Sequence, residues 1–256
     1  MENNTLPALN QCFDMTFANK HTARAVRVPK ENNAAQVLKT LGFTEPKPCL
    51  FVSGGASYMS AEDRKRIEEI LNGVAGFIEE IGGVIIDGGT EAGVMQMVGE
   101  ARAQGKFNFP LVGVSPLGKV SYPGYKNPHE EAFLEDNHSH FVLVDGDAWG
   151  DESQTIVNLT YDICNKRQLP SAGILINGGI IAMHEIYLAS TTELQLPILV
   201  LEGSGRTADE ISTAFRTGNT NRGILRAILA GGDIQIIAAD EGMDVVRKKL
   251  AERFKM

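Results

Sequence analysis

Cysteine, histidine and tryptophan are scarce in this chain. Its 256 residues include three cysteines, five histidines and one tryptophan. Cys12, Cys49 and Cys164 are odd in number and far apart, which argues against a disulfide framework and against zinc-binding spacing. His138 and His140 lack a third convergent ligand, so we expect them to be structural or to contact a ligand. We therefore expect reduced thiols, no metal site and a cytoplasmic protein.

Signals for membranes, secretion and nucleic acids are also missing. No apolar run approaches the roughly 20 residues that a membrane-spanning helix requires. Residues 1–4 carry neither the basic region nor the apolar core of a signal peptide. The formal net charge is −8, whereas binding to a phosphate backbone needs clustered Lys and Arg. We expect neither a membrane nor a nucleic acid as partner.

Two catalytic signatures are absent as well. No G-x-G-x-x-G follows the first expected strand of the regular pattern, which argues against a nicotinamide dehydrogenase. No G-x-S-x-G elbow precedes an expected helix, so Ser53, Ser115 and Ser204 are not credible hydrolase nucleophiles. What the chain does have is glycine, with 27 residues, several of them in clusters.

Four glycine clusters each follow a short apolar run that ends at residue 52, 86, 176 or 201. The clusters are Ser53-Gly54-Gly55, Asp87-Gly88-Gly89-Thr90, Asn177-Gly178-Gly179 and Gly203-Ser204-Gly205-Arg206. Runs of Val, Ile and Leu are typical of parallel strands buried on both faces. Since parallel strands direct their carboxyl ends to one edge of the sheet, we expect the four loops to converge on one crevice. Glycine backbones and helix N-termini in such a crevice favour a phosphate-bearing small molecule.

The alternation of apolar runs with helical periodicity predicts a Rossmann-like α/β fold. We expect a doubly wound, mostly parallel sheet of about seven strands in a three-layer α/β/α arrangement. Ser60, with Asp63 three residues later, predicts the start of a helix over 61–81. A second helix is expected over 91–104.

Two segments depart from this regular pattern. Residues 1–47 are expected to be an extension with a hairpin, packed on a main domain of residues 48–256. Residues 116–137 form a long stretch with Gly, Pro, Tyr and His. A loop of that length in a compact domain predicts a binding element or a lid.

The string DGGTEAGVM at residues 87–95 resembles the G-G-x-x-G-[LV]-M motif of the SLOG superfamily. The order of the motifs is most similar to the LSDAT-type domain at the N-terminus of TRPM-type cation channels, and to its stand-alone prokaryotic relatives. The similarity covers roughly residues 48–254. It runs through FVSGG at 51–55, GVSPLG at 113–118, NHSHFVLVD at 137–145, NGG at 177–179 and GSGRTAD at 203–209.

That resemblance implies a domain that binds a nucleotide or a nucleotide-derived ligand such as ADP-ribose. Gly88, Gly89 and Thr90 are then the expected phosphate loop, and Ser204 with Arg206 forms a second anion site. The full set of expected contacts is Ser53, Gly54, Gly55, Gly88, Gly89, Thr90, Gly118, Asp145, Asn177, Gly178, Gly179, Gly203, Ser204, Gly205 and Arg206. The alternative is that these clusters are tight turns, with Thr90 as a helix cap and Arg206 in a surface ion pair.

Glu185 is the candidate for a catalytic carboxylate. The "lonely guy" phosphoribohydrolases, more distant SLOG members, carry P-G-G-x-G-T-x-x-E, and this chain reads NGGIIAMHE at 177–185. Both glycines and Glu185 match, whereas Asn177, Ile181 and Ala182 replace the proline, the third glycine and the threonine. The resemblance implies that the glutamate acts at the ribose. The loss of the Gly-Thr pair argues against that catalysis.

Three functions follow from these observations. The favoured one is a ligand sensor that binds a nucleotide-derived small molecule, with no other cofactor and with self-association expected by analogy. The second is a hydrolase or transferase that acts at a ribose N-glycosidic or phosphate bond, with Glu185 as its carboxylate. The third is a scaffold whose crevice is vestigial.

Overall fold

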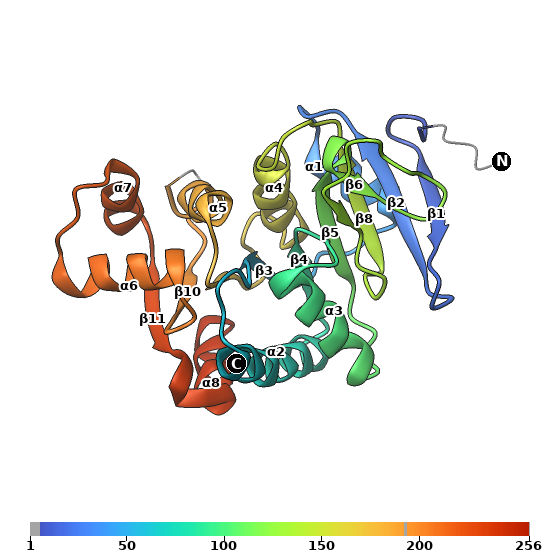
Figure 1. The fold of residues 1–256 in the computed structure, drawn as a ribbon. Helices are drawn as coiled ribbons and strands as arrows, with labels where there is room; N and C mark the ends of the chain where they lie inside the picture. Colours follow the sequence, from blue (N-terminus) through green and yellow to red (C-terminus); the bar gives the residue numbers. More distant parts are fainter. Residues whose placement is uncertain (1–5, 192–193, 256) are drawn as a thin grey trace.

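The computed structural model describes residues 6–191 and 194–255. Within them, nine strands form one sheet in the order β1-β2-β8-β5-β4-β3-β9-β10-β11 (Figure 1). Every neighbouring pair is parallel except β1 and β2. The strands of this sheet are β1 (Cys12–Thr16), β2 (Thr22–Val28), β3 (Cys49–Gly54), β4 (Val84–Asp87), β5 (Leu111–Pro116), β8 (His140–Val144), β9 (Ser171–Ile176), β10 (Ile198–Glu202) and β11 (Ile234–Ala238).

Helices cover both faces of this sheet and complete the three layers (Figure 1). One face carries α2 (Ala61–Glu80), α3 (Gly93–Gln104) and α8 (Gly242–Arg253). The other carries α1 (Ala34–Leu41), α4 (Ser153–Ile163), α5 (Ile180–Thr191), α6 (Arg206–Thr217) and α7 (Gly223–Gly231). In the described part of the chain, no helix has the length and apolarity needed to cross a membrane. The predicted α/β class is confirmed.

Alternating side chains of each central strand supply two separate cores. On β3, Leu50 and Val52 pack with α2, α3 and α8, whereas Cys49 and Phe51 pack with the helices of the opposite face. All four side chains are at most 1 % exposed. Burial on both faces explains why the strand has no polar residue before Ser53.

The sheet has nine strands rather than about seven because the amino-terminal hairpin joins it. β2 lies parallel to β8, with Arg24 opposite His140, and β1 pairs antiparallel with β2 at the edge. The seven remaining strands are those that the apolar runs predict. β4, β5 and β8 lie on one side of β3, and β9, β10 and β11 on the other. The point between β3 and β9 is therefore the topological switch at which such folds bind ligands.

Residues 116–137, which we call the insertion, fold into short ordered pieces. A 3-10 turn η1 (Leu117–Lys119) leads to β6 (Val120–Ser121), which pairs with β7 (Ala132–Phe133) in a second, two-stranded sheet. Thr90 forms an antiparallel bridge with Leu134, and the Glu91 N–H donates to the carbonyl of Phe133 at 2.8 Å.

This contact corrects the expected start of α3, which begins at Gly93 instead of Glu91. Thr90 and Glu91 are held in the bridge to the insertion and are not helical. Thr90 is therefore not the helix cap, and the N-cap residue is Ala92, which makes no side-chain cap bond. The other expected cap is confirmed, because Ser60 accepts a hydrogen bond from the N–H of Asp63 at the start of α2.

A buried charged cluster fixes the loop between β4 and α3. His138 donates to Asp87 Oδ1 at 2.9 Å and to Glu135 Oε2 at 2.6 Å, and the three side chains are at most 3 % exposed. Burial lowers the pKa of His138, but the two carboxylates outweigh it and raise the pKa to about 9. Asp87 Oδ1 also accepts the N–H of Gly89 at 2.8 Å. A buried imidazolium thus ties the end of β4 to the insertion.

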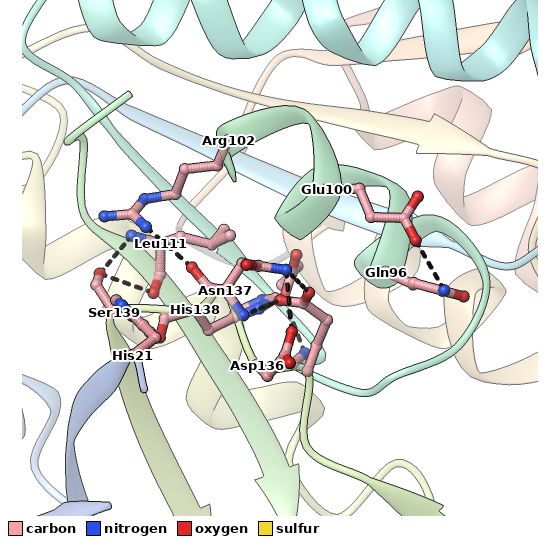
Figure 2. Close-up of polar contacts among 12 residues, drawn as sticks. His21, Gln96, Glu100, Arg102, Leu111, Asp136, Asn137, His138 and Ser139 are labelled. Atoms are coloured by element: carbon pink, nitrogen blue, oxygen red, sulfur yellow. Dashed lines mark hydrogen bonds and ion pairs between the residues drawn. The ribbon is translucent and has the colours of Figure 1, made fainter. Parts of the chain in front are cut away.

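The segment around this histidine is held from both sides. Figure 2 shows Asn137 beside Arg102 of α3, whose guanidinium donates to the Asn137 carbonyl at 3.0 Å. Ser139 and Leu111 exchange hydrogen bonds on the other side, which fixes the start of β8 against β5. The imidazole of His138 is therefore held in place by backbone contacts on either side.

Gly113→Ala should destabilise the protein, because the β4–α3 loop lies directly on β5 at this point. A Cβ on Gly113 would lie 2.5 Å from Cα of Gly89, which cannot yield as a side chain can. We expect a loss of about 1–3 kcal/mol in the free energy of unfolding, measured with urea. As control, Gly76→Ala in α2 would place Cβ 3.6 Å from Phe107 and should stabilise by about 0.5–1 kcal/mol. Equal effects of the two substitutions would contradict the close approach.

The stabilising effect of His138 should depend on pH. Between pH 6.5, its ordinary pKa, and about 9, the folded protein binds one more proton than the unfolded chain, so stability falls as pH rises. The rise of the pKa from 6.5 to about 9 corresponds to about 3 kcal/mol in the free energy of unfolding. In urea unfolding from pH 6 to pH 10, the stability difference between wild type and His138→Gln should narrow as pH rises. The exposed His129→Gln should show no such trend, and a constant difference for His138→Gln would mean that His138 is uncharged.

Candidate functional site

A cavity of about 350 Å³ lies at the switch point, at the carboxyl ends of the strands. The four glycine loops follow β3, β4, β9 and β10, which are neighbours in the sheet. Each loop contributes to the wall of the cavity, which we call the crevice. The expected site residues that line it are Gly54, Gly55, Gly88, Thr90, Gly179, Glu185 and Arg206.

A second group of expected residues builds the loops from behind and does not line the crevice. The Asn177 N–H donates to Ser204 Oγ at 2.7 Å, which joins two of the loops. The Gly203 N–H donates to Asp209 Oδ1 at 2.6 Å, so Asp209 stabilises this loop. The remaining members of this group are Ser53, Gly89, Gly178 and Gly205.

The β3 and β9 loops are in direct contact across the switch point. A Cβ on Gly54 would lie 2.1 Å from the carbonyl oxygen of Ile176, so no larger residue fits there without a backbone shift. The close approach of these two backbones sets the width of the crevice between the β3 loop and the β9 loop.

Gly118 and Asp145 lie outside the crevice. Both line a different cavity of about 370 Å³, at the ends of β5 and β8. The two carboxylate oxygens of Asp145 accept hydrogen bonds from Arg27 at 2.6 and 3.0 Å. The structure therefore does not bring these two residues together with the four glycine loops.

The amino-terminal end of α5 forms the electropositive side of the crevice. Gly179, Ile180, Ile181 and Ala182 line the wall, and the first N–H groups of a helix have no partner within the helix. The Arg206 guanidinium lies over this end, since a Cβ on Gly179 would lie 2.9 Å from Nη2. Backbone amides and a permanent charge thus converge on one position.

Arg206 is held in an uncommon conformation. Its φ of 46° is in the left-handed region, which residues with a side chain seldom adopt. Its guanidinium lies 5.9 Å from the ring centre of Tyr58, which is 97 % exposed. Among the described residues it forms no ion pair, so its charge is not neutralised by a carboxylate. Backbone strain of this kind is concentrated at functional positions.

One N–H group of the expected phosphate loop, and the next two after the loop, are used within the protein. The Gly89 N–H donates to Asp87, the Glu91 N–H to Phe133, and the Ala92 N–H to the Thr90 carbonyl. The amides at the start of α5 are therefore better placed to hold an anion than those of the β4–α3 loop.

Two buried carboxyl groups also line the crevice: Glu185 in the second turn of α5, and Glu152 just before α4. Glu185 is 7 % exposed and accepts a hydrogen bond from Ser53 Oγ at 2.5 Å. Burial raises its pKa to about 8, and the nearby charges of Glu152 and Asp87 add to the shift. Burial likewise raises the pKa of Glu152 to about 7. At neutral pH Glu185 is mostly protonated.

Sequence reasoning identified Glu185 but missed Glu152. Glu152 lies in the loop between β8 and α4, where its Oε2 accepts the N–H of Gly150 at 2.8 Å. An acidic residue just before a helix that follows a buried strand is the signal that could have identified it. Trp149 of the same loop lines the crevice and donates to Glu131 of the insertion at 2.7 Å.

The wall of the crevice therefore combines helix N–H groups and Arg206, two buried carboxyl groups and an apolar rim. Ile180, which is 77 % exposed, and Trp149 belong to this rim. Among the described residues, no group of three or more His, Cys, Asp and Glu is placed to hold a metal ion. The arrangement suits a molecule with an anionic group, hydroxyl groups and a flat apolar part.

Comparisons with known proteins agree with this architecture. The chain is 27 % identical over 259 residues to a TRPM channel member-like 2 of Nematostella vectensis, covering 85 % of this chain and 16 % of that protein. It is 25 % identical over 236 residues to TRPM member 2 of Rattus norvegicus, covering 77 % and 15 %. For TRPM member 6 of Mus musculus the identity is 24 % over 208 residues, covering 70 % and 10 %.

The chain spans less than a fifth of the length of these relatives. The family model described as "SLOG in TRPM, prokaryote" matches residues 47–247, which is most of the chain. The motifs that resembled this family in the sequence lie in the matched part. The chain therefore belongs to the prokaryotic family of the SLOG domain found in TRPM channels.

Proposed function

We propose that this protein binds a nucleotide-derived small molecule, such as ADP-ribose or a relative, and acts as a ligand sensor. The observation that carries the proposal is the pairing of two features in one crevice. One is the α5 end with Arg206, and the other is the buried pair Glu152 and Glu185. The anionic part of the ligand lies beside Arg206 and the first N–H groups of α5. Its hydroxyl groups lie beside Glu152 and Glu185.

Because Glu185 is protonated, it does not repel the anionic group that Arg206 and the α5 N–H groups attract. A carboxylate at this depth would repel a phosphate in the same cavity, because charges interact strongly at low dielectric. With a pKa of about 8, Glu185 is mostly neutral at pH 7. Its Oε2 accepts from Ser53, and a protonated carboxyl group can also donate to a ribose hydroxyl.

The relatives support ligand binding as the shared role of this segment. They are cation channels by name, and this chain corresponds to 16 % or less of their length. We assign binding, and not ion conduction, to the shared segment. Self-association stays a prediction by analogy.

A nucleotide-processing hydrolase or transferase is the second candidate. Two carboxyl groups with pKa values of about 8 and about 7 in one cavity resemble an acid and base pair. Against it, a protonated Glu185 cannot stabilise an oxocarbenium-like transition state by its charge. Ile181 and Ala182 also replace the Gly-Thr pair of the phosphoribohydrolases. We therefore favour binding without turnover.

Arg206→Gln should weaken the binding of anionic ligands. Thermal-shift titrations with AMP, ADP, ADP-ribose and NAD should give a saturable shift, since a ligand at a hundredfold excess over Kd stabilises by about 2.7 kcal/mol. Loss of a charge-assisted contact should reduce that affinity about 10- to 100-fold. Arg216→Gln on the same helix, outside the crevice, is the control and should bind as wild type. No shift with any of these compounds would refute the proposal.

Glu185→Gln should separate sensor from enzyme. For a sensor, ADP-ribose affinity at pH 7 should stay within about threefold of wild type, because glutamine is neutral like the protonated acid. Wild-type affinity should fall as pH rises through about 8, where Glu185 ionises, and the variant should not follow. The exposed Glu69→Gln should behave as wild type.

Chromatography of the same mixtures tests the second candidate. Product that forms with wild type and disappears with Glu185→Gln would move the assignment to an enzyme. Product that persists in the variant would remove Glu185 from catalysis.

A further inference from the structure

A third cavity, of about 510 Å³, lies between the insertion and the turn that joins β1 to β2. Its walls carry the aromatic side chains of Phe17, Tyr122, Tyr125 and Phe133. We call it the aromatic cavity. No residue of the four glycine clusters lines the aromatic cavity. Glu91, which directly follows the second cluster, does line it.

The aromatic walls are held in place by local contacts. Tyr122 and Tyr125 are stacked, with ring centres 5.1 Å apart and an interplanar angle of 27°. Their backbones exchange hydrogen bonds of 3.1 and 2.9 Å around the Pro123-Gly124 turn. Phe133, on the other wall, is 46 % exposed and lies under Lys126, whose Nζ is 5.1 Å from the ring centre. Flat apolar surfaces are therefore present before any ligand binds.

A buried hydroxyl group in this wall lacks a partner. Tyr122 is 5 % exposed, and its hydroxyl makes no hydrogen bond to any described residue. Burial raises the pKa of Tyr122 further above its ordinary value, so the group stays a donor at physiological pH. Buried polar groups are nearly always satisfied by protein, water or ligand.

The charged residues in the wall of the cavity are mainly acidic. Glu91 and Asp136 line it, and neither forms an ion pair with a described cation. Figure 2 shows Asp136 at the end of the insertion, beside Asn137, whose side chain donates to it at 3.1 Å. Lys126, the lysine of the wall, is paired with Glu130. A positively charged ligand is therefore favoured over an anion.

We propose that the aromatic cavity is a second binding site, which takes a small planar aromatic amine. The ring lies between the tyrosine pair and Phe133, and the ammonium group lies near Glu91 and Asp136. This preference is opposite to that of the crevice, where Arg206 and α5 favour an anion.

The test compares two probes that share one ring system, tryptamine and indole-3-acetate. Tryptamine carries an ammonium group and indole-3-acetate a carboxylate. In calorimetric titrations of the whole protein, tryptamine should bind saturably and about tenfold more tightly than indole-3-acetate, because the two acidic residues attract one and repel the other. Equal affinities, or no saturable binding of tryptamine, would overturn the proposal.

Two pairs of variants locate the site. Phe133→Ala should weaken tryptamine binding about tenfold through loss of stacking, whereas Phe215→Ala, 49 % exposed on α6, should not. Glu91→Gln combined with Asp136→Asn should bring the affinity for tryptamine close to that for indole-3-acetate, and the exposed Glu45→Gln should leave both unchanged. Tryptamine binding that Arg206→Gln weakens and Phe133→Ala does not would place the probe in the crevice and overturn the proposal.

Discussion

A protonated histidine between two buried carboxylates holds the end of β4 against the insertion. His138 joins the end of β4, through Asp87, to the end of the insertion, through Glu135. The same contact fixes the loop that presents Thr90 to the crevice and Glu91 to the aromatic cavity. Because all three groups are removed from water, the imidazolium and the two carboxylates depend on each other for charge compensation. The crevice and the aromatic cavity therefore share a wall whose position depends on this cluster.

The crevice that we propose as an anion site also has two buried carboxyl groups in its wall. Helix α5 and Arg206 provide positive potential, while burial keeps Glu185, in the second turn of the same helix, mostly protonated. The chain as a whole carries a net charge of −8, so the proposed preference for an anion rests on local geometry. The switch between β3 and β9 supplies that geometry, since it places the first N–H groups of α5 beside the β3 loop.

The sequence predicts features that depend on local pattern. The seven central strands, the helix cap at Ser60 and the meeting of four glycine loops all follow from apolar runs and turn residues. Features that depend on distant contacts were missed. His138 was expected to be structural or to contact a ligand, and the structure shows it in a structural role. Its partner Asp87 could not be named, because no local pattern links the two residues. The start of α3, the place of the hairpin in the sheet and the burial of Glu152 likewise depend on segments far away in the chain.

The pairing of β2 with β8 has a consequence for the order in which the chain folds. The hairpin of β1 and β2 is synthesised before β5 and β8, yet its place in the sheet, with Arg24 opposite His140, exists only after β8 has formed beside β5. An isolated two-stranded hairpin is at best marginally stable in water. Contacts between segments so distant in sequence slow folding, because a long loop must close before they form. The hairpin is thus made before the strand with which it pairs, and it can take its place in the sheet only after that strand has formed.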